Sequence, residues 1–149
     1  MKPEITMQDS VALIMLHNIP ADAAFIHSVF EEIAKMNIDV DMISISPAQS
    51  THTTLSFTVS DDDLFQVLGY VSKLKNMSIK PIVSSGNCKI TISDKEMEGC
   101  PGVAATIFAA VAEVNTDIRL VTTSESQVSL LMTQAHADAV LDALGNTFD

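Results

Sequence analysis

Basic residues are scarce in this sequence of 149 residues, which has eight Lys and Arg against 19 Asp and Glu and a net charge of −11. Nucleic acids and anionic membranes are bound through basic patches, so this balance argues against both as partners. Long hydrophobic runs are also missing, because the longest, Val11 to Leu16, is far shorter than a membrane span. No apolar signal-peptide core is present near Met1. We therefore expect a soluble, cytoplasmic protein.

Cysteines and catalytic motifs are equally sparse. Cys88 and Cys100 match no metal or redox spacing, and the histidines are scattered. The chain has no phosphate-binding loop, no dinucleotide fingerprint and no nucleophile elbow. We interpret the acidic run at 61–63 as a solvated helix start rather than as metal ligands. The expectation is free thiols, with no metal, cofactor or catalytic residue.

What the chain does contain is an internal repeat. Residues 25–44 align without a gap on residues 103–122, at a constant offset of 78 residues (103 − 25). Asn37 meets Asn115 in this alignment, Phe30 meets Phe108 and Ala34 meets Ala112. The chain therefore consists of two copies of one unit of about 75 residues.

Copy one is predicted to run strand, helix, strand, strand, helix, strand. Apolar residues at a spacing of three or four predict amphipathic helices, and alternation predicts strands. Ser60 can cap the second helix, and the aspartates after it favour its positive end. The predicted elements are strand 11–17, helix 23–36, strands 39–46 and 53–59, a helix with a buried face from 64 to 74, and strand 78–83.

Copy two repeats this order but lacks the last strand. Its predicted elements are strand 87–93, helix 101–114, strands 117–123 and 127–133, and helix 135–144. The unassigned N-terminal piece, residues 3–7, is expected to supply the missing strand. The predicted fold class is α+β, with two ferredoxin-like βαββαβ domains in tandem and the first inserted into the second. Their predicted extents are 8–84 and 3–7 plus 85–149, joined by a short linker at 84–87.

The pair Pro101-Gly102, before the first helix of copy two, is the strongest candidate for a site. Proline suits a first helical turn, glycine allows close approach of a ligand, and free first-turn N–H groups favour a carboxylate. An amino-acid ligand also needs a partner for its ammonium group, and the sequence offers Asp117, Ser124 and Glu125. The alternative, in which Pro-Gly is only a turn before a helix, stays open.

These segments resemble the regulatory region of aspartate kinases. "PGVAATIFAAVAEVNTDI" followed by "TTSESQVSLL" is similar to the second ACT domain of those enzymes, and "NIDVDMIS" with "TTLSFTVSDDDL" is similar to the first. The resemblance implies tandem ACT domains that bind lysine or threonine, for feedback control of lysine, threonine and methionine biosynthesis. It also implies a homodimer held through ACT domains and a kinase catalytic domain or subunit as a partner.

The resemblance places the intact effector loop in copy two. Cys100 replaces the histidine that is common before the proline, and the rest of the loop remains. Together with Asp117, the ammonium partner suggested above, the expected effector-binding residues are Cys100, Pro101, Gly102, Val103, Ala104, Ser124 and Glu125.

Copy one departs from the family pattern. The family loop P-D-x-P-G reads "PADAA" at 20–24, so that Ala21 stands where Asp is expected and two alanines replace Pro-Gly. A second, degenerate site would comprise Ala23, Ala24, Asp39 and Asp41.

Two functions follow from these observations. The leading hypothesis is an amino-acid-binding regulatory module of aspartate kinase that has no catalytic site of its own. The alternative is an ACT-type dimerisation or scaffold protein that binds no small molecule. Without a kinase domain, the chain is expected to be a separate regulatory subunit, an excised fragment or a stand-alone relative.

Overall fold

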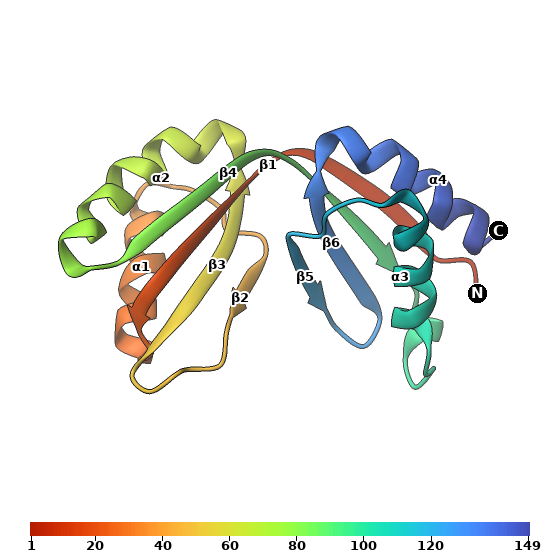
Figure 1. Cartoon of the computed structure of the whole chain (residues 1–149), viewed down its shortest axis with the longest axis horizontal. Coiled ribbons are helices and arrows are strands. Elements are labelled where there is room, and N and C mark those ends of the chain that lie inside the picture. The colour runs from red at the N-terminus through yellow and green to blue at the C-terminus, as the bar shows by residue number, and fades with distance from the viewer. The chain divides into compact units, whose positions relative to one another are not determined.

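In the computed structural model, two long strands, β1 (Glu4–Pro20) and β4 (Lys80–Ser93), take part in both compact units of the chain (Figure 1). One unit consists of residues 10–85. The other, here called the terminal unit, consists of residues 1–9 together with 86–149.

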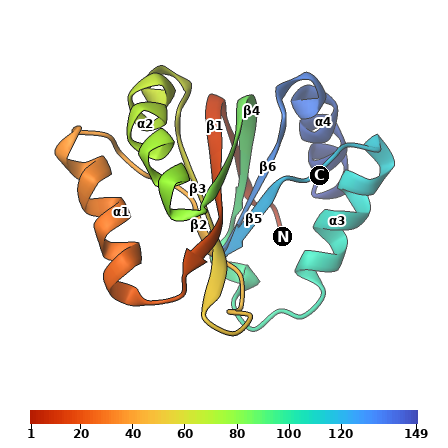
Figure 2. The same cartoon turned by 60° about the vertical axis from the view of Figure 1, so that its left-hand side comes forward.

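The 10–85 unit is a sheet with strand order β2-β3-β1-β4, in which β3 pairs antiparallel with both β1 and β2. Helices α1 and α2 cover one face of this sheet (Figure 2). Alternate residues of β1 and β3, such as Ile14 and Phe57, pack there against Val29 and Ile33 of α1. The remaining bounds are α1 (Ala23–Lys35), β2 (Ile43–Ile45), β3 (His52–Ser60), η1 (Asp61–Asp63), α2 (Leu64–Val71) and η2 (Ser72–Met77).

The terminal unit repeats this arrangement with strand order β1-β4-β6-β5, in which β6 pairs antiparallel with β4 and β5. Ile90 and Leu130 of the sheet pack against Ile107 of α3 and Val140 of α4. The N-terminal strand therefore lies at the edge of this sheet, next to β4. The bounds are η3 (Lys95–Met97), α3 (Val103–Val114), β5 (Leu120–Thr123), β6 (Gln127–Thr133), η4 (Gln134–His136) and α4 (Ala137–Thr147).

The structure describes residues 1–149, apart from the side chains of residues 75–77. Within this part of the chain, no helix has the length and apolar character needed to cross a membrane. Cys88 and Cys100 are both free; Cys88 is buried, and burial raises the pKa of its thiol.

The boundary between the two units falls within the predicted linker at 84–87, but these residues do not form a loop, because they continue β4. Residues 6–10 likewise continue β1, although their side chains are exposed. Backbone pairing between the neighbouring strands β1 and β4 needs no apolar side chains, so hydrophobic alternation does not reveal it. The strands β2 and β5 are shorter than predicted. The residues before them form backbone hydrogen bonds outside the regular strand pairing, such as the bond from the Arg119 N–H to the Leu131 carbonyl (2.8 Å).

Asn37 and Asn115, which the repeat aligns, end α1 and α3 in the same way. Both have a φ of 57°. The Asn37 N–H donates to the Ala34 carbonyl (2.9 Å), and the Asn115 N–H donates to the Ala112 carbonyl (3.2 Å). Asparagine tolerates this left-handed conformation better than other residues with a Cβ, so both helices stop where the next strand segment must turn back.

Replacing either asparagine tests this explanation. Asn115→Ala should lower the free energy of unfolding by about 1 kcal/mol, because alanine pays the steric cost of the left-handed conformation. Asn115→Gly should be within about 0.5 kcal/mol of the parent, since glycine adopts it freely. Urea unfolding measures both, with Asn37→Ala and Asn37→Gly as the matched pair. Equal stabilities of the alanine and glycine variants would refute the explanation.

Candidate functional site

The turn before α3 leaves the first N–H groups of that helix uncovered. Gly102 occupies the N-cap position with a φ of 91° and, having no side chain, makes no side-chain cap hydrogen bond. The structure starts α3 at Val103, so the prediction that Pro101 lies in the helix is wrong; the left-handed Gly102 separates them. Because Val103 and Ala104 carry only aliphatic side chains, the amide donors of the first turn remain open to a ligand.

The turn between β5 and β6 lies at the same end of the terminal unit as the start of α3 (Figure 1). The Asp94 N–H, just after β4, donates to the Ser126 carbonyl in this turn (3.0 Å), and the Ser124 N–H donates to the Gln127 carbonyl (2.9 Å). Glu125 is exposed at the tip, as is Cys100 before α3. The structure therefore brings the Cys100–Ala104 segment and the Ser124–Glu125 pair to one end of the unit.

Asp117 lies at the opposite end. Its carboxylate accepts hydrogen bonds from Arg119 Nε (2.8 Å) and from the Thr133 hydroxyl (3.1 Å). Thr133 pairs with Asn87, whereas the hairpin side of β6 pairs with Ser93, so the two ends are about 20 Å apart along the strands. The structure thus does not bring Asp117 to the start of α3.

Arg119 holds this opposite end together. While its Nε binds Asp117, its Nη1 donates to Oδ1 of the buried Asn87 (2.7 Å). His136 Nδ1 lies 3.9 Å from the same Asp117 carboxylate and 2.7 Å from the Thr116 hydroxyl. These contacts join the start of β4 within this unit to the segment before β5, which explains a structural role for Asp117.

Copy one differs at the matching helix start. The Asp22 carboxylate accepts the Phe25 N–H at 2.7 Å and caps α1. Ala23 and Ala24 follow this cap as the exposed first residues of the helix. A carboxylate of the protein therefore already occupies the position where a ligand carboxylate would bind.

The other residues of the degenerate site lie apart from this start. Asp39 and Asp41 are exposed and follow the C-terminal end of α1, whose length puts them about 20 Å from Ala23. The Asp41 N–H donates to the Thr58 carbonyl (3.1 Å) and fixes this segment beside β3. The structure does not gather the residues of the degenerate site.

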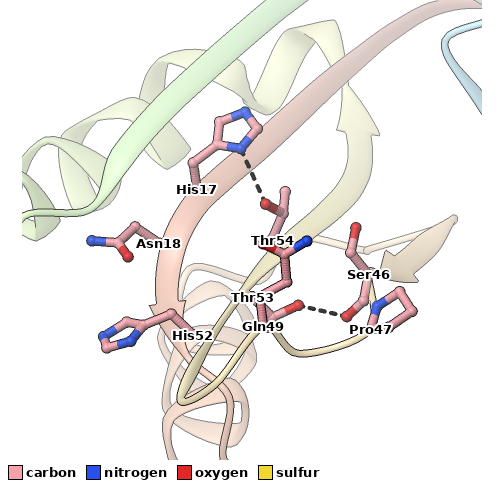
Figure 3. Close-up of a pocket in the computed structure, with 8 residues that line it drawn as sticks. All are labelled: His17, Asn18, Ser46, Pro47, Gln49, His52, Thr53 and Thr54. Atoms are coloured by element: carbon pink, nitrogen blue, oxygen red, sulfur yellow. Dashed lines mark hydrogen bonds between the residues drawn. The ribbon is translucent and has the colours of Figure 1, made fainter.

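Sequence reasoning missed a polar pocket in the 10–85 unit, where the hairpin between β2 and β3 meets the end of β1 (Figure 3). It has a volume of about 430 Å³. His17 Nδ1 lies 3.1 Å from the Thr54 hydroxyl, and His52 Nδ1 lies 2.8 Å from the Thr51 hydroxyl. The sequence did contain a signal for this pocket, because copy one has more residues between its second and third predicted strands than copy two has. Six of the residues that line the pocket are His17, Asn18, Ser46, Gln49, His52 and Thr54.

Comparisons with known proteins give a family and a set of relatives. Residues 90–148 match a family model described as ACT domain. The chain is 26% identical to the aspartokinase of Bacillus sp. (strain MGA3), and the match covers 97% of this chain and 36% of that protein. The chain therefore spans about a third of this curated relative.

Two solved structures match along nearly their whole length. The regulatory subunit of aspartate kinase from Thermus thermophilus, solved in its ligand-free form, is 27% identical, has a TM-score of 0.85, and covers 97% of both chains. The regulatory subunit of aspartate kinase from Thermus flavus is also 27% identical, with a TM-score of 0.87 and the same coverage.

The cluster around Asp117 predicts a pH dependence of stability. The hydrogen bond from Arg119, helped by that from Thr133, holds the pKa of Asp117 below its ordinary value of 3.8. Its contribution to stability is therefore present above that ordinary value and is lost as the pH falls through the lowered pKa. Asp117→Asn should remove this acid-dependent loss from the free energy of unfolding. The loss is less than about 1 kcal/mol, because the carboxylate is about half exposed.

Urea unfolding at a series of acidic pH values measures this change. Asp142→Asn, on the exposed side of α4, is the matched control and should keep the parent curve. An acid profile of Asp117→Asn that coincides with that of the parent would show that the pair contributes nothing.

Proposed function

We propose that the chain is an amino-acid-binding regulatory module of an aspartate kinase and that residues 90–148, which match the ACT domain model, form one of its ACT domains. The observation that carries the proposal is the start of α3, which has no side-chain cap at Gly102 and lies at the same end of the terminal unit as the turn between β5 and β6 (Figure 1). That turn carries Glu125. The match to two regulatory subunits over 97% of the chain supports the regulatory role.

The ligand carboxylate would bind the amides of the first turn of α3. The N-terminus of a helix carries about half a positive charge, and its first N–H groups point outward. Gly102 has no Cβ, and apart from its two chain neighbours no described residue has an atom within 4 Å of the position that a Cβ would take. A carboxylate can therefore approach the amides of Val103 and Ala104.

The ligand ammonium group would pair with Glu125. This side chain is exposed on the hairpin that is tied to the end of β4 by the Asp94–Ser126 hydrogen bond. Ser124, next to it, supplies a hydroxyl for the same ligand. Asp117, the other candidate from the sequence, is bonded to Arg119 at the far end of the unit.

The ligand proposed is lysine or threonine, and binding would serve feedback control of aspartate-family biosynthesis. We propose that both copies are ACT domains, residues 8–84 and residues 3–7 plus 85–149, with the first inserted into the second. The compact units at 10–85 and at 1–9 with 86–149 support these limits. Because Asp22 already caps α1, we assign the amino-acid site to copy two and a structural role to copy one.

A homodimer would form through the sheet edges. The edge strand β2 exposes Ile43 and Ile45, each at 46%. Exposed apolar edge strands favour pairing with another chain. A second copy of this chain could extend the sheet there, and sedimentation as a monomer at micromolar concentration would contradict this assembly.

Calorimetric titration with lysine and with threonine tests the amino-acid site. One of them should bind, and at a hundred times its dissociation constant it should add about 2.7 kcal/mol to stability, seen as a higher melting temperature. Glu125→Gln should weaken binding about tenfold, because the ammonium group loses its charged partner.

Glu113→Gln provides the matched control. Glu113 is exposed near the C-terminal end of α3, away from the first turn, and its replacement should leave affinity unchanged. Flat titrations with all twenty amino acids would overturn the proposed function. Equal losses from the two glutamine variants would overturn the assignment of Glu125.

A further inference from the structure

Helix α2 presents an apolar side chain to its surroundings. Phe65, in the first turn of α2, is 88% exposed, the highest value among the large hydrophobic residues that the structure describes. Leu68 is exposed at 38%, whereas Val67 and Val71 turn inward and are buried. Residues spaced by three or four positions share one side of a helix. The exposed side, here called the α2 face, is formed by Phe65, Leu68, Gly69 and Ser72.

The second copy of the fold shows that helix packing does not require such a face. The pair η1 and α2 corresponds to η4 and α4 at an offset of 73 residues (137 − 64), at which the buried valines of α2 meet buried residues of α4. At the same offset Phe65 meets Asp138 and Gly69 meets Asp142, and both aspartates are exposed. Copy two therefore forms the same helix with carboxylates at these positions, so folding alone does not explain the α2 face.

A hollow lies next to the α2 face, between α2 and the edge strand β4. Its volume is about 260 Å³, and an apolar cavity of about 150 Å³ already accepts a benzene ring. Gly69 adds open space on the helix itself, because a Cβ there would meet no described atom within 4 Å beyond its neighbours in the helix. The hollow is thus large enough for the phenyl ring of another molecule. Its lining consists of Leu68, Val71, Ser72, Pro81 and Val83.

The charges along α2 suit a second copy of the same helix. Three aspartates, residues 61–63, precede α2, and the exposed Lys73 follows it. In an antiparallel pair centred on residue 67, Phe65 lies opposite the partner's Gly69. The same register puts Asp61 opposite the partner's Lys73, because both pairs are symmetric about residue 67. Ring and notch, and acid and base, therefore match in one two-fold arrangement.

Strand addition is not the mode of contact that this side of the unit favours. In the 10–85 unit β4 is an edge strand, but Pro81 has no N–H to donate to a neighbouring strand. Proline on an edge strand opposes pairing with another chain. A partner on this side therefore contacts the helix and the hollow rather than the strand backbone.

We propose that the α2 face binds the α2 face of a second copy of this chain. Each Phe65 enters the hollow beside the partner's Gly69, and the acidic start of each helix lies against the lysine at the end of the other. This contact is separate from the proposed pairing at β2 and from the proposed amino-acid site at α3. One helix and one hollow from each copy form a small interface, so association is expected at about 0.1–1 mM.

Sedimentation velocity of the full chain from about 10 µM to about 1 mM tests this contact. The parent should gain one association step over this range, and in NMR spectra the backbone amide signals of Phe65 and Gly69 should shift with protein concentration. Phe65→Asp should weaken the association about tenfold or more, because it puts a carboxylate in place of the ring that fills the hollow. The variant is expected to fold, since copy two carries Asp138 at this position.

Gln66→Asp is the matched control. It adds the same charge to the same helix at an exposed position, about 100° around the helix axis from Phe65, and should keep the parent association. Two results would overturn the proposal: no added mass up to about 1 mM, or equal weakening by the two aspartate variants. Concentration-dependent shifts confined to the amides of Ile43 and Ile45 would also overturn it, in favour of pairing at β2 alone. Lysine and threonine titrations report on α3, so failure here is distinguishable from failure of the amino-acid site.

Discussion

The unsatisfied N–H groups at the start of a helix are the constraint on which this account rests. Every α-helix begins with donors that have no partner inside the helix, and something else must supply acceptors. In α1 the Asp22 carboxylate does so at 2.7 Å. In α3 the N-cap is Gly102, which has no side chain, and the donors remain available. One fold, used twice in one chain, thus presents a closed helix start and an open one.

The sheets and their cores hold these helix starts in place. In each unit two helices pack on one sheet face through fully buried aliphatic residues, among them Ile33 of α1 and Ile107 of α3. Such packing fixes the position of the start of α3 relative to the β5–β6 hairpin. The hydrogen bond from the Asp94 N–H to the Ser126 carbonyl holds that hairpin at the end of β4. At the other end, the contacts of Arg119 with Asp117 and Asn87 fix the strand starts. The Asp117–Arg119–Asn87 cluster and the open helix start therefore lie at opposite ends of one sheet.

Much of this arrangement could be predicted from the sequence, because helices and strands with buried faces leave periodic apolar patterns. Asn37 and Asn115 mark the repeat, and both end their helices with the same φ. The paths of β1 and β4 between their predicted halves were missed, since exposed strand residues leave no such pattern. The position of Asp117 could have been deduced, because a strand that follows a helix starts near the end of that helix, not its beginning. The Asp22 cap and the polar pocket beside the β2–β3 hairpin depend on side-chain geometry, which spacing alone does not specify.

Backbone amide shifts in NMR spectra, followed during titration with lysine and with threonine, test the difference between the two helix starts most directly. The account predicts that one amino acid shifts the amides of Val103 and Ala104 saturably, while the amides of Ala23 and Ala24 stay in place behind the Asp22 cap. Shifts of equal size at both helix starts, or none at Val103 and Ala104, would contradict it.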